Sequence, residues 1–193
     1  AEVLHQQLGL RLASLSLIIP GSRMRADGDF APICDTFIGP CPYAGQREAW
    51  LILRIDTAID NVEALRVRRS LSETAVAAAQ RTANMLRTKG IRAEVASETD
   101  LVSLDEKLGS AASLDAAKRR WLAVRDERGW LSSFYFPARH IEDAAMALVW
   151  ERRHDAVTQN ITLYPDGRCT ATVTVRGPQI VSPPPNVKLF SLP

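Results

Sequence analysis

The sequence predicts an α/β fold, with α+β as the alternative: a mixed sheet with helices packed on it. Segments that alternate like strands lie on both sides of an amphipathic helical segment at residues 70–90. A Tyr-Pro-Asp-Gly turn at residues 164–167 joins two further alternating segments and predicts a hairpin over residues 157–176. The 193 residues, 46% of them hydrophobic, suffice for one domain with a core that needs neither disulfides nor metals.

The first strand is expected at residues 12–19, where β-forming residues alternate until Pro20 and Gly21 end the pattern. Residues 21–45 are rich in Gly, Pro and Asp and have no period. They are expected to form a long loop, and long loops usually bind something or carry a function.

The clearest buried strand is expected at residues 48–56, because one of its faces is wholly apolar. That face consists of Ala49, Leu51, Leu53 and Ile55. After a turn, residues 62–69 alternate again, which predicts a hairpin over residues 48–69.

The strongest helix signal follows at residues 70–90. Ser70 and Glu73 have capping-box spacing, and Gly90 provides the C-terminal stop. The face expected to pack on the strand at residues 48–56 is made of Leu71, Ala75, Ala78, Ala79, Thr82, Met85 and Leu86. A short strand at residues 91–96 would complete a ββαβ unit.

Residues up to Leu108 form a further short helix, for which Ser97 and Thr99 are alternative caps. Residues 113–127 are expected to be helical and strongly charged, with Leu114, Ala117, Trp121 and Val124 as the apolar stripe. The remaining predictions are a strand at 130–136, a helix at 142–151, the 157–176 hairpin and an extended Pro-rich arm from 177 to 185.

Composition excludes several classes of function. Lys and Arg number 24 against 22 Asp and Glu, and a net charge of +2 does not predict nucleic-acid binding. No apolar run is long enough to span a membrane. Cys34, Cys41 and Cys169 have no metal-type spacing. They are expected to be reduced thiols, although Cys34 and Cys41 are close enough in sequence to pair.

No motif of a phosphate-binding loop, a dinucleotide fold, a serine hydrolase or a zinc protease occurs. The histidines, His5, His140 and His154, fall on different predicted elements. We therefore expect a protein that is not an enzyme, with no catalytic, cofactor-binding or metal-binding residues.

Two basic clusters are candidates for a partner interface. Arg66 and Arg68 alternate onto one face of a predicted strand, and Lys118, Arg119 and Arg120 form a run. A solvated surface is the plain alternative. If they bind, arginine forks suit carboxylates, so an acidic protein partner is expected.

The segment with Gln46, Arg47, Trp50, Leu53 and Arg54 resembles the Q/R-R-x-x-W-hydrophobic-x-L-R strand of the EccE family of type VII (ESX) secretion systems. The resemblance covers residues 45–176, the expected family core. Its other matching positions are Arg69 to Leu71, the Ala-rich helix, Gly90 to Ala93, Trp121, Gly129, Trp130, Ser132, Ser133, Phe134, Ile141, Leu148 and Trp150.

This resemblance implies a single domain over residues 1–193, with 1–44 poorly matched and 177–193 as the tail. It further implies N-terminal transmembrane helices outside the present sequence and a location at the inner membrane with this domain facing the cytoplasm. The implied role is structural: assembly with EccB, the ATPase EccC and EccD into a complex that exports small folded proteins.

The alternative function is a degenerate nucleotide-sugar-binding domain similar to a glycosyltransferase, without retained activity. Such enzymes anchor a metal with paired carboxylates at a strand end. Asp56 is a single carboxylate at that position, with no D-x-D motif.

Overall fold

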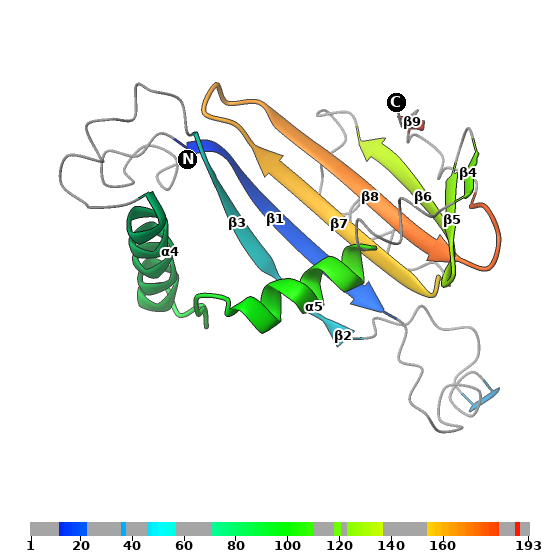
Figure 1. Ribbon diagram of the computed structural model, residues 1–193, viewed down its shortest axis with the longest axis horizontal. Helices are drawn as coiled ribbons and strands as arrows, with labels where there is room; N and C mark the ends of the chain where they lie inside the picture. Colours follow the sequence, from blue (N-terminus) through cyan, green and yellow to red (C-terminus); the bar gives the residue numbers. More distant parts are fainter. Residues whose placement is uncertain are drawn as a thin grey trace. The chain divides into compact units, whose positions relative to one another are not determined.

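The computed structural model describes residues 12–22, 36–37, 46–56, 71–109, 118–120, 123–136, 154–181 and 188–189 (Figure 1). The chain divides into two units. Unit 1 comprises Ala1–Ser16, Leu51–Leu104 and Thr162–Cys169, and unit 2 comprises Leu17–Trp50, Asp105–Ile161 and Thr170–Pro193. No helix in the described ranges has the length and apolar character needed to cross a bilayer.

The described strands pair in the order β2-β1-β7-β8-β6-β5-β4, and β9 pairs with β6. Most of their residues lie in unit 2, whereas residues 12–16 of β1, 162–163 of β7 and 169 of β8 belong to unit 1. The registers of β1 with β2, β4 with β5, β5 with β6, and β6 with β8 and β9 are antiparallel. The predicted class is thereby confirmed in its α+β form. The strand bounds are β1 Leu12–Ser22, β2 Gln46–Arg47, β4 Lys118–Arg120, β5 Ala123–Asp126, β6 Gly129–Phe136, β7 Ala156–Leu163, β8 Cys169–Gly177 and β9 Lys188–Leu189.

One face of β6, β7 and β8 forms the core of unit 2. Alternate residues are buried in the second half of β6 (Ser132, Phe134 and Phe136) and in the middle of β8 (Ala171, Val173 and Val175), as the predicted alternation requires. Each large side chain buried there contributes about 1.5–3 kcal/mol. On the opposite face, the Ser133 and Thr174 hydroxyls share a hydrogen bond of 2.8 Å. We call the buried set the β6–β8 core: Phe134, Phe136, Val157, Ala171, Val173 and Val175.

The β7–β8 hairpin closes at the predicted turn. The Tyr164 N–H donates to the Arg168 carbonyl (2.9 Å), and the Gly167 N–H donates to the Tyr164 carbonyl (3.0 Å). Gly167 has φ 82, a conformation that glycine adopts without a side-chain penalty. The prediction from the Pro-Asp-Gly sequence is confirmed.

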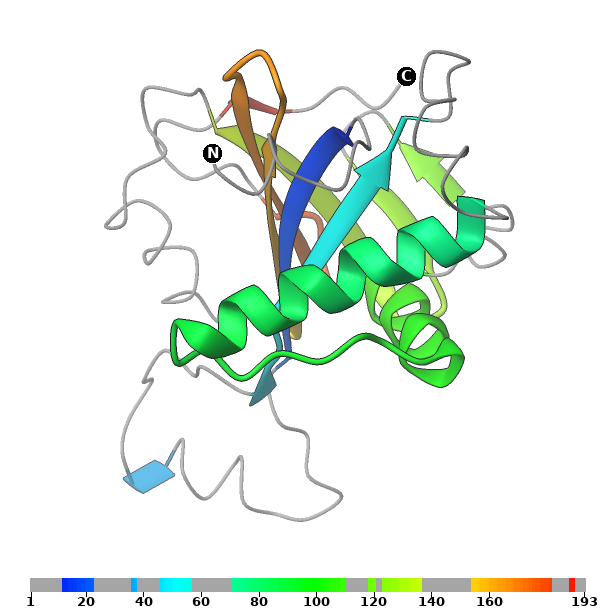
Figure 2. The ribbon, with the colours of Figure 1, turned by 90° about the vertical axis from the view of Figure 1, so that its left-hand side faces the viewer.

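Unit 1 contains the predicted Ala-rich helix as α4 (Leu71–Thr88), which crosses β3 (Trp50–Ile55) in Figure 2. Ala78 is fully buried and packs against Leu53 and Ile55 of β3, so the predicted partner strand is confirmed. The helix ends as predicted: the Gly90 N–H donates to the Arg87 carbonyl at 3.0 Å, and Gly90 has φ 79.

The expectation that residues 48–56 form the clearest buried strand is wrong. Leu51 and Ile52, which belong to opposite faces of β3, are each 37% exposed. In the described part of the chain β3 pairs with β1, and the second half of the predicted 48–69 hairpin lies outside that part. An apolar face in a sequence does not reveal how many strands lie beside it in the sheet or what packs on that face.

The predicted strand at 91–96 is also wrong, because these residues have no regular structure. The Ala93 carbonyl accepts a 2.6 Å hydrogen bond from Arg87 Nε of α4. The predicted ββαβ unit is therefore not formed through this segment. Helix α5 (Glu98–Leu108) follows, and of the two candidate caps Ser97 acts: its Oγ accepts the Asp100 N–H at 3.3 Å, and Asp100 Oδ2 accepts the Ser97 N–H at 2.8 Å.

The helix expected at residues 113–127 is replaced by strands over its described residues, namely β4 and β5. The Arg128 N–H donates to Asp126 Oδ1 at 2.9 Å in the turn that leads into β6. Gly129 has φ 125, and a side chain there would meet the Gly177 carbonyl at 2.7 Å. The intrinsic helical preference of this segment is weak. The pairing of β4 with β5 and of β5 with β6 therefore decides its structure.

Strand β1 continues past its predicted end at Pro20. The Pro20 carbonyl accepts the Glu48 N–H at 3.2 Å, and Gly21 pairs with Arg47. Proline lacks only a donor, so pairing through its carbonyl remains available. The predicted helix at residues 142–151 lies outside the described residues, as does most of the predicted loop at 21–45.

Candidate interaction site

The structure describes only one of the two predicted basic clusters. Arg66 and Arg68 lie outside the described residues. Lys118, Arg119 and Arg120 constitute strand β4, the last strand in the order of unit 2 (Figure 1). A charged end strand is a common protection against edge-to-edge association of sheets, and it is also a place where a partner can bind.

The register places the three residues of β4 in three successive rows, paired with Arg125, Val124 and Ala123 of β5. One row joins Lys118, Arg125 and Trp130. Neighbouring rows of a pleated sheet belong to opposite faces, so Arg119, which is paired with Val124, is on the other face.

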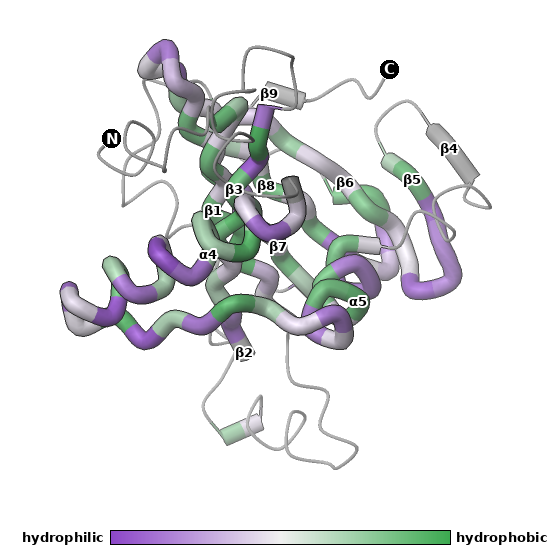
Figure 3. The backbone as a smooth tube through the Cα atoms, turned by 60° about the vertical axis from the view of Figure 1, so that its left-hand side comes forward, coloured by the Kyte–Doolittle hydropathy of each residue, from purple (hydrophilic) through white to green (hydrophobic). Residues whose placement is uncertain are grey.

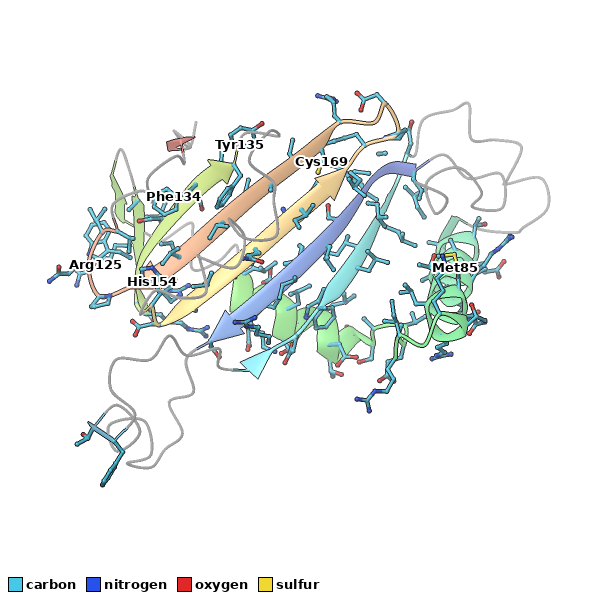
Figure 4. The ribbon with its side chains drawn as sticks, turned by 180° about the vertical axis from the view of Figure 1, so that it is seen from behind. Met85, Arg125, Phe134, Tyr135, His154 and Cys169 are labelled. Atoms are coloured by element: carbon cyan, nitrogen blue, oxygen red, sulfur yellow. The ribbon has the colours of Figure 1, made fainter. Side chains whose placement is uncertain are left out.

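The face with Arg125 carries an exposed charge. Arg125 lies over the Trp130 ring, with its guanidinium carbon 5.6 Å from the ring centroid, and points outward from the sheet in Figure 4. The connection from β5 to β6 is the hydrophilic stretch at this margin in Figure 3. Arg128 in that connection donates from Nη1 to the Glu106 carbonyl at 3.1 Å. This margin of unit 2 can therefore present cations to an acidic partner.

A buried ion pair anchors this margin to the sheet. Arg176 Nη1 of β8 lies 2.5 Å from Asp126 Oδ1 of β5, and the two side chains are 9% and 4% exposed. Burial opposes the charge of Asp126, but the hydrogen bond and positive charge of Arg176, with the Arg128 N–H, prevail and lower the pKa of that carboxyl. The pair ties together residues 50 positions apart.

Sequence reasoning missed this pair. Asp126 was placed on the charged face of a helix, and Arg176 was the last residue of an alternating strand. The only signal available was that an arginine occupied the end of an otherwise Thr- and Val-rich strand. Its partner could not be identified before the register of β5, β6 and β8 was known.

Other groups capable of chemistry are dispersed. Cys169 is a free, half-buried thiol, and His154 lies at a distance from it on the far end of the β7–β8 hairpin (Figure 4). Within the described ranges no group of three or more His, Cys, Asp or Glu side chains is arranged to hold a metal ion.

Comparison with known proteins gives one matching family. Residues 43–136 match the family model described as "Putative type VII ESX secretion system translocon, EccE". The match includes β3, α4, α5 and the β4–β6 margin. It lies mostly within the segment, residues 45–176, that the resemblance in the sequence had indicated.

Two curated relatives carry the same family name. The chain is 45% identical over 171 residues to the ESX-2 secretion system protein EccE2 of Mycobacterium tuberculosis (strain CDC 1551 / Oshkosh), which covers 89% of this chain and 32% of the relative. It is 27% identical over 113 residues to the ESX-5 secretion system protein EccE5 of Mycobacterium marinum (strain ATCC BAA-535 / M), which covers 58% and 28% respectively. The chain thus spans about a third of the length of these relatives.

Proposed function

The chain belongs to the EccE family, and we propose that it serves as a structural component of a type VII (ESX) secretion machine rather than as an enzyme. The observation that carries this proposal is the 45% identity to an ESX-2 secretion system protein over 89% of the chain. Similarity of that extent, spread over many elements, supports a shared role for this part of the protein.

The proposed setting is a membrane complex at the inner membrane, with this domain on the cytoplasmic side. The proposed partners are EccB, the ATPase EccC and EccD. In this role the domain contributes protein contacts that hold the complex together while small folded proteins are exported.

We place one of these contacts at the β4–β5 margin of unit 2, on the row of Lys118 and Arg125. Its support is the end position of β4 and the exposed guanidinium of Arg125. Arg66 and Arg68 are a second candidate contact, which rests on the sequence alone. Exposed charges of this kind act mainly on the rate of association and on its salt dependence.

The test is recovery of the partners on tagged full-length protein from a host that produces the whole system. Variants Lys118→Glu with Arg125→Glu, and Arg66→Glu with Arg68→Glu, are compared with Arg81→Glu with Arg92→Glu. The control residues Arg81 and Arg92 are exposed cations of unit 1.

We expect the first two variants to recover less EccB, EccC and EccD than the wild type, with unchanged melting. The deficit should be largest at low salt, where repulsion from an acidic partner is least screened. Normal recovery at both salt concentrations would exclude these arginines and lysines from the interface. If the wild-type protein recovers none of the three partners, the structural role itself fails.

A further inference from the structure

A small cavity of about 50 Å³ lies in unit 2 beside the buried Arg176. Leu108 and Lys107 at the end of α5 contribute to its lining, and strands β6, β7 and β8 supply the rest: Leu131, Ala156, Thr158, Thr174 and Arg176. A single water molecule requires about 10–15 Å³ measured in this way. The cavity therefore has room for several waters or for one small ion.

The cavity contains a hydrogen-bond donor that the protein leaves unused. Arg176 is 8% exposed, and its Nη2 is buried without a hydrogen-bond partner among the described residues. Nη1 of the same guanidinium is bound to Asp126. A buried guanidinium nitrogen without an acceptor loses its hydrogen bond to water and gains none in return, so an acceptor supplied from outside would be favoured.

The backbone leaves space around this nitrogen. Gly109 follows α5 with φ 91, and a Cβ at that position would lie 3.4 Å from Arg176 Nη2 and 3.5 Å from Leu131 Cδ1. The missing side chain keeps the region beside Nη2 open. Glycine at position 109 therefore meets two requirements: it adopts the left-handed backbone conformation, and it leaves the space beside Arg176 Nη2 unfilled.

The charges around the cavity nearly balance. Lys107, a lining residue, has its Nζ 2.6 Å from Glu48 Oε2, and Arg176 is paired with Asp126. Each cation thus already has one carboxylate, while its other N–H groups can still donate. The Thr158 and Thr174 hydroxyls add polar groups to the lining. Such a site offers donors rather than a large positive charge, which suits a monovalent ligand better than a divalent one.

We propose that this cavity binds a small monovalent oxyanion, a carboxylate of the size of formate or acetate, with one oxygen accepting from Arg176 Nη2. The carboxylate can be a free ion or the end of an acidic side chain from another protein. This proposal is independent of the secretion role.

The experiment follows backbone and Arg176 Nε resonances of the full chain by NMR during titration. Acetate, formate and N-acetyl-aspartate methylamide are added, with inorganic phosphate as the divalent probe and sodium chloride as the ionic-strength control. We expect saturable shifts at Gly109, Leu131 and Thr158 with the carboxylates, and weaker ones with phosphate. Tighter binding of the aspartate compound than of acetate would identify a protein side chain as the natural source.

Variants locate the binding. Thr158→Val and Lys107→Met should each weaken acetate binding by about two- to tenfold, the effect of losing one hydrogen bond. Thr172→Val, on the same strand as Thr174 but outside the cavity lining, should leave it unchanged. Arg176→Lys should abolish it if that variant folds.

Two results would overturn the proposal. One is the absence of saturable shifts at any of these residues beyond those caused by sodium chloride, which would leave ordered water as the occupant. The other is acetate binding that is equally strong in the wild type, Thr158→Val and Lys107→Met, which would place the ion elsewhere.

Discussion

The β6–β8 core of unit 2 and the α4–β3 contact of unit 1 are held by side chains of opposite size. In the β6–β8 core, Phe134 and Phe136 are 1% and 3% exposed and fill space with large rings. At the α4–β3 contact Ala78, which is 0% exposed, presents a single methyl group, and its neighbours Leu53 and Ile55 are only partly buried.

This difference teaches that the two regions respond to opposite kinds of substitution. A core of large side chains loses contacts when it is truncated, and a close contact between a helix and a sheet loses them when a small residue is enlarged. Phe134→Ala and Ala78→Leu test this comparison directly. Asp126→Ala and Ser97→Ala extend it to contacts made by polar groups, and the four are given in order of decreasing expected effect.

Truncation in the β6–β8 core should have the largest effect. Phe134→Ala removes a ring that is 1% exposed and should lower the free energy of unfolding by about 3–5 kcal/mol. Phe37, which is 84% exposed, provides the matched control as Phe37→Ala. Chemical denaturation measures both. Similar losses in the two variants would contradict the assigned core.

Breaking the buried ion pair should cost about 3 kcal/mol, at the lower end of measured values, because Asp126→Ala leaves the Arg176 guanidinium uncompensated. The pKa of Asp126 is lowered in the folded state, so its stabilising contribution is complete above the unfolded value of about 3.9. It is lost as the pH falls through the lower, folded pKa.

The difference between wild type and Asp126→Ala should therefore be constant from about pH 7 to pH 5 and shrink below about pH 4. Asp166→Ala, which breaks the exposed pair with Arg168, should leave the melting midpoint nearly unchanged. Melting curves over this pH range provide the measurement. A difference that grows on acidification would reverse the assigned sign.

Enlarging the small residue of the α4–β3 contact should destabilise by about 1–3 kcal/mol, since Ala78→Leu overpacks a site that is 0% exposed. Ala79→Leu, at a half-buried position, should cost less, and Arg81→Ala on the exposed face should cost almost nothing. Urea denaturation ranks the three. The reverse order for Ala78 and Ala79 would mean that the helix is rotated from its assigned face.

The smallest effect is expected at the start of α5. Ser97→Ala removes the hydroxyl that accepts the Asp100 N–H and should cost about 1 kcal/mol. Ser103→Ala, within the same helix, is the control. Amide hydrogen exchange at residues 99–102 should accelerate in the first variant only. Equal exchange rates in the two variants would show that the Ser97 cap does not stabilise the N-terminus of α5.

The fold could be predicted where local chemistry decides the structure. The β7–β8 hairpin follows from Pro165 and Gly167 at its turn, and α4 follows from its small apolar face and Gly90. These signals depend on the backbone preferences of a few residues, and they hold in any surroundings.

The rest depends on contacts between distant segments. The helical pattern of β4 and β5 carries only a weak intrinsic preference, and the pairing of β4 with β5 and of β5 with β6 makes these segments strands. The same pairing decides the candidate site: Lys118 and Arg119 are neighbours in sequence but belong to different rows. Arg176 acquires a partner, and a cavity, only once β8 lies beside β6.

The hydrogen bond of 2.8 Å between Ser16 and Thr162 spans 146 positions of the chain. This contact between β1 and β7 can form only after a costly closure, whereas the β7–β8 hairpin closes over a five-residue turn, Tyr164 to Arg168. During synthesis β1 can pair with β2 and β3 early, but its contact with β7 must wait until Thr162 has emerged. We expect φ-values near zero for Leu15→Ala and clearly higher ones for Val173→Ala. Equal values would contradict the formation of the β7–β8 hairpin before the β1–β7 contact.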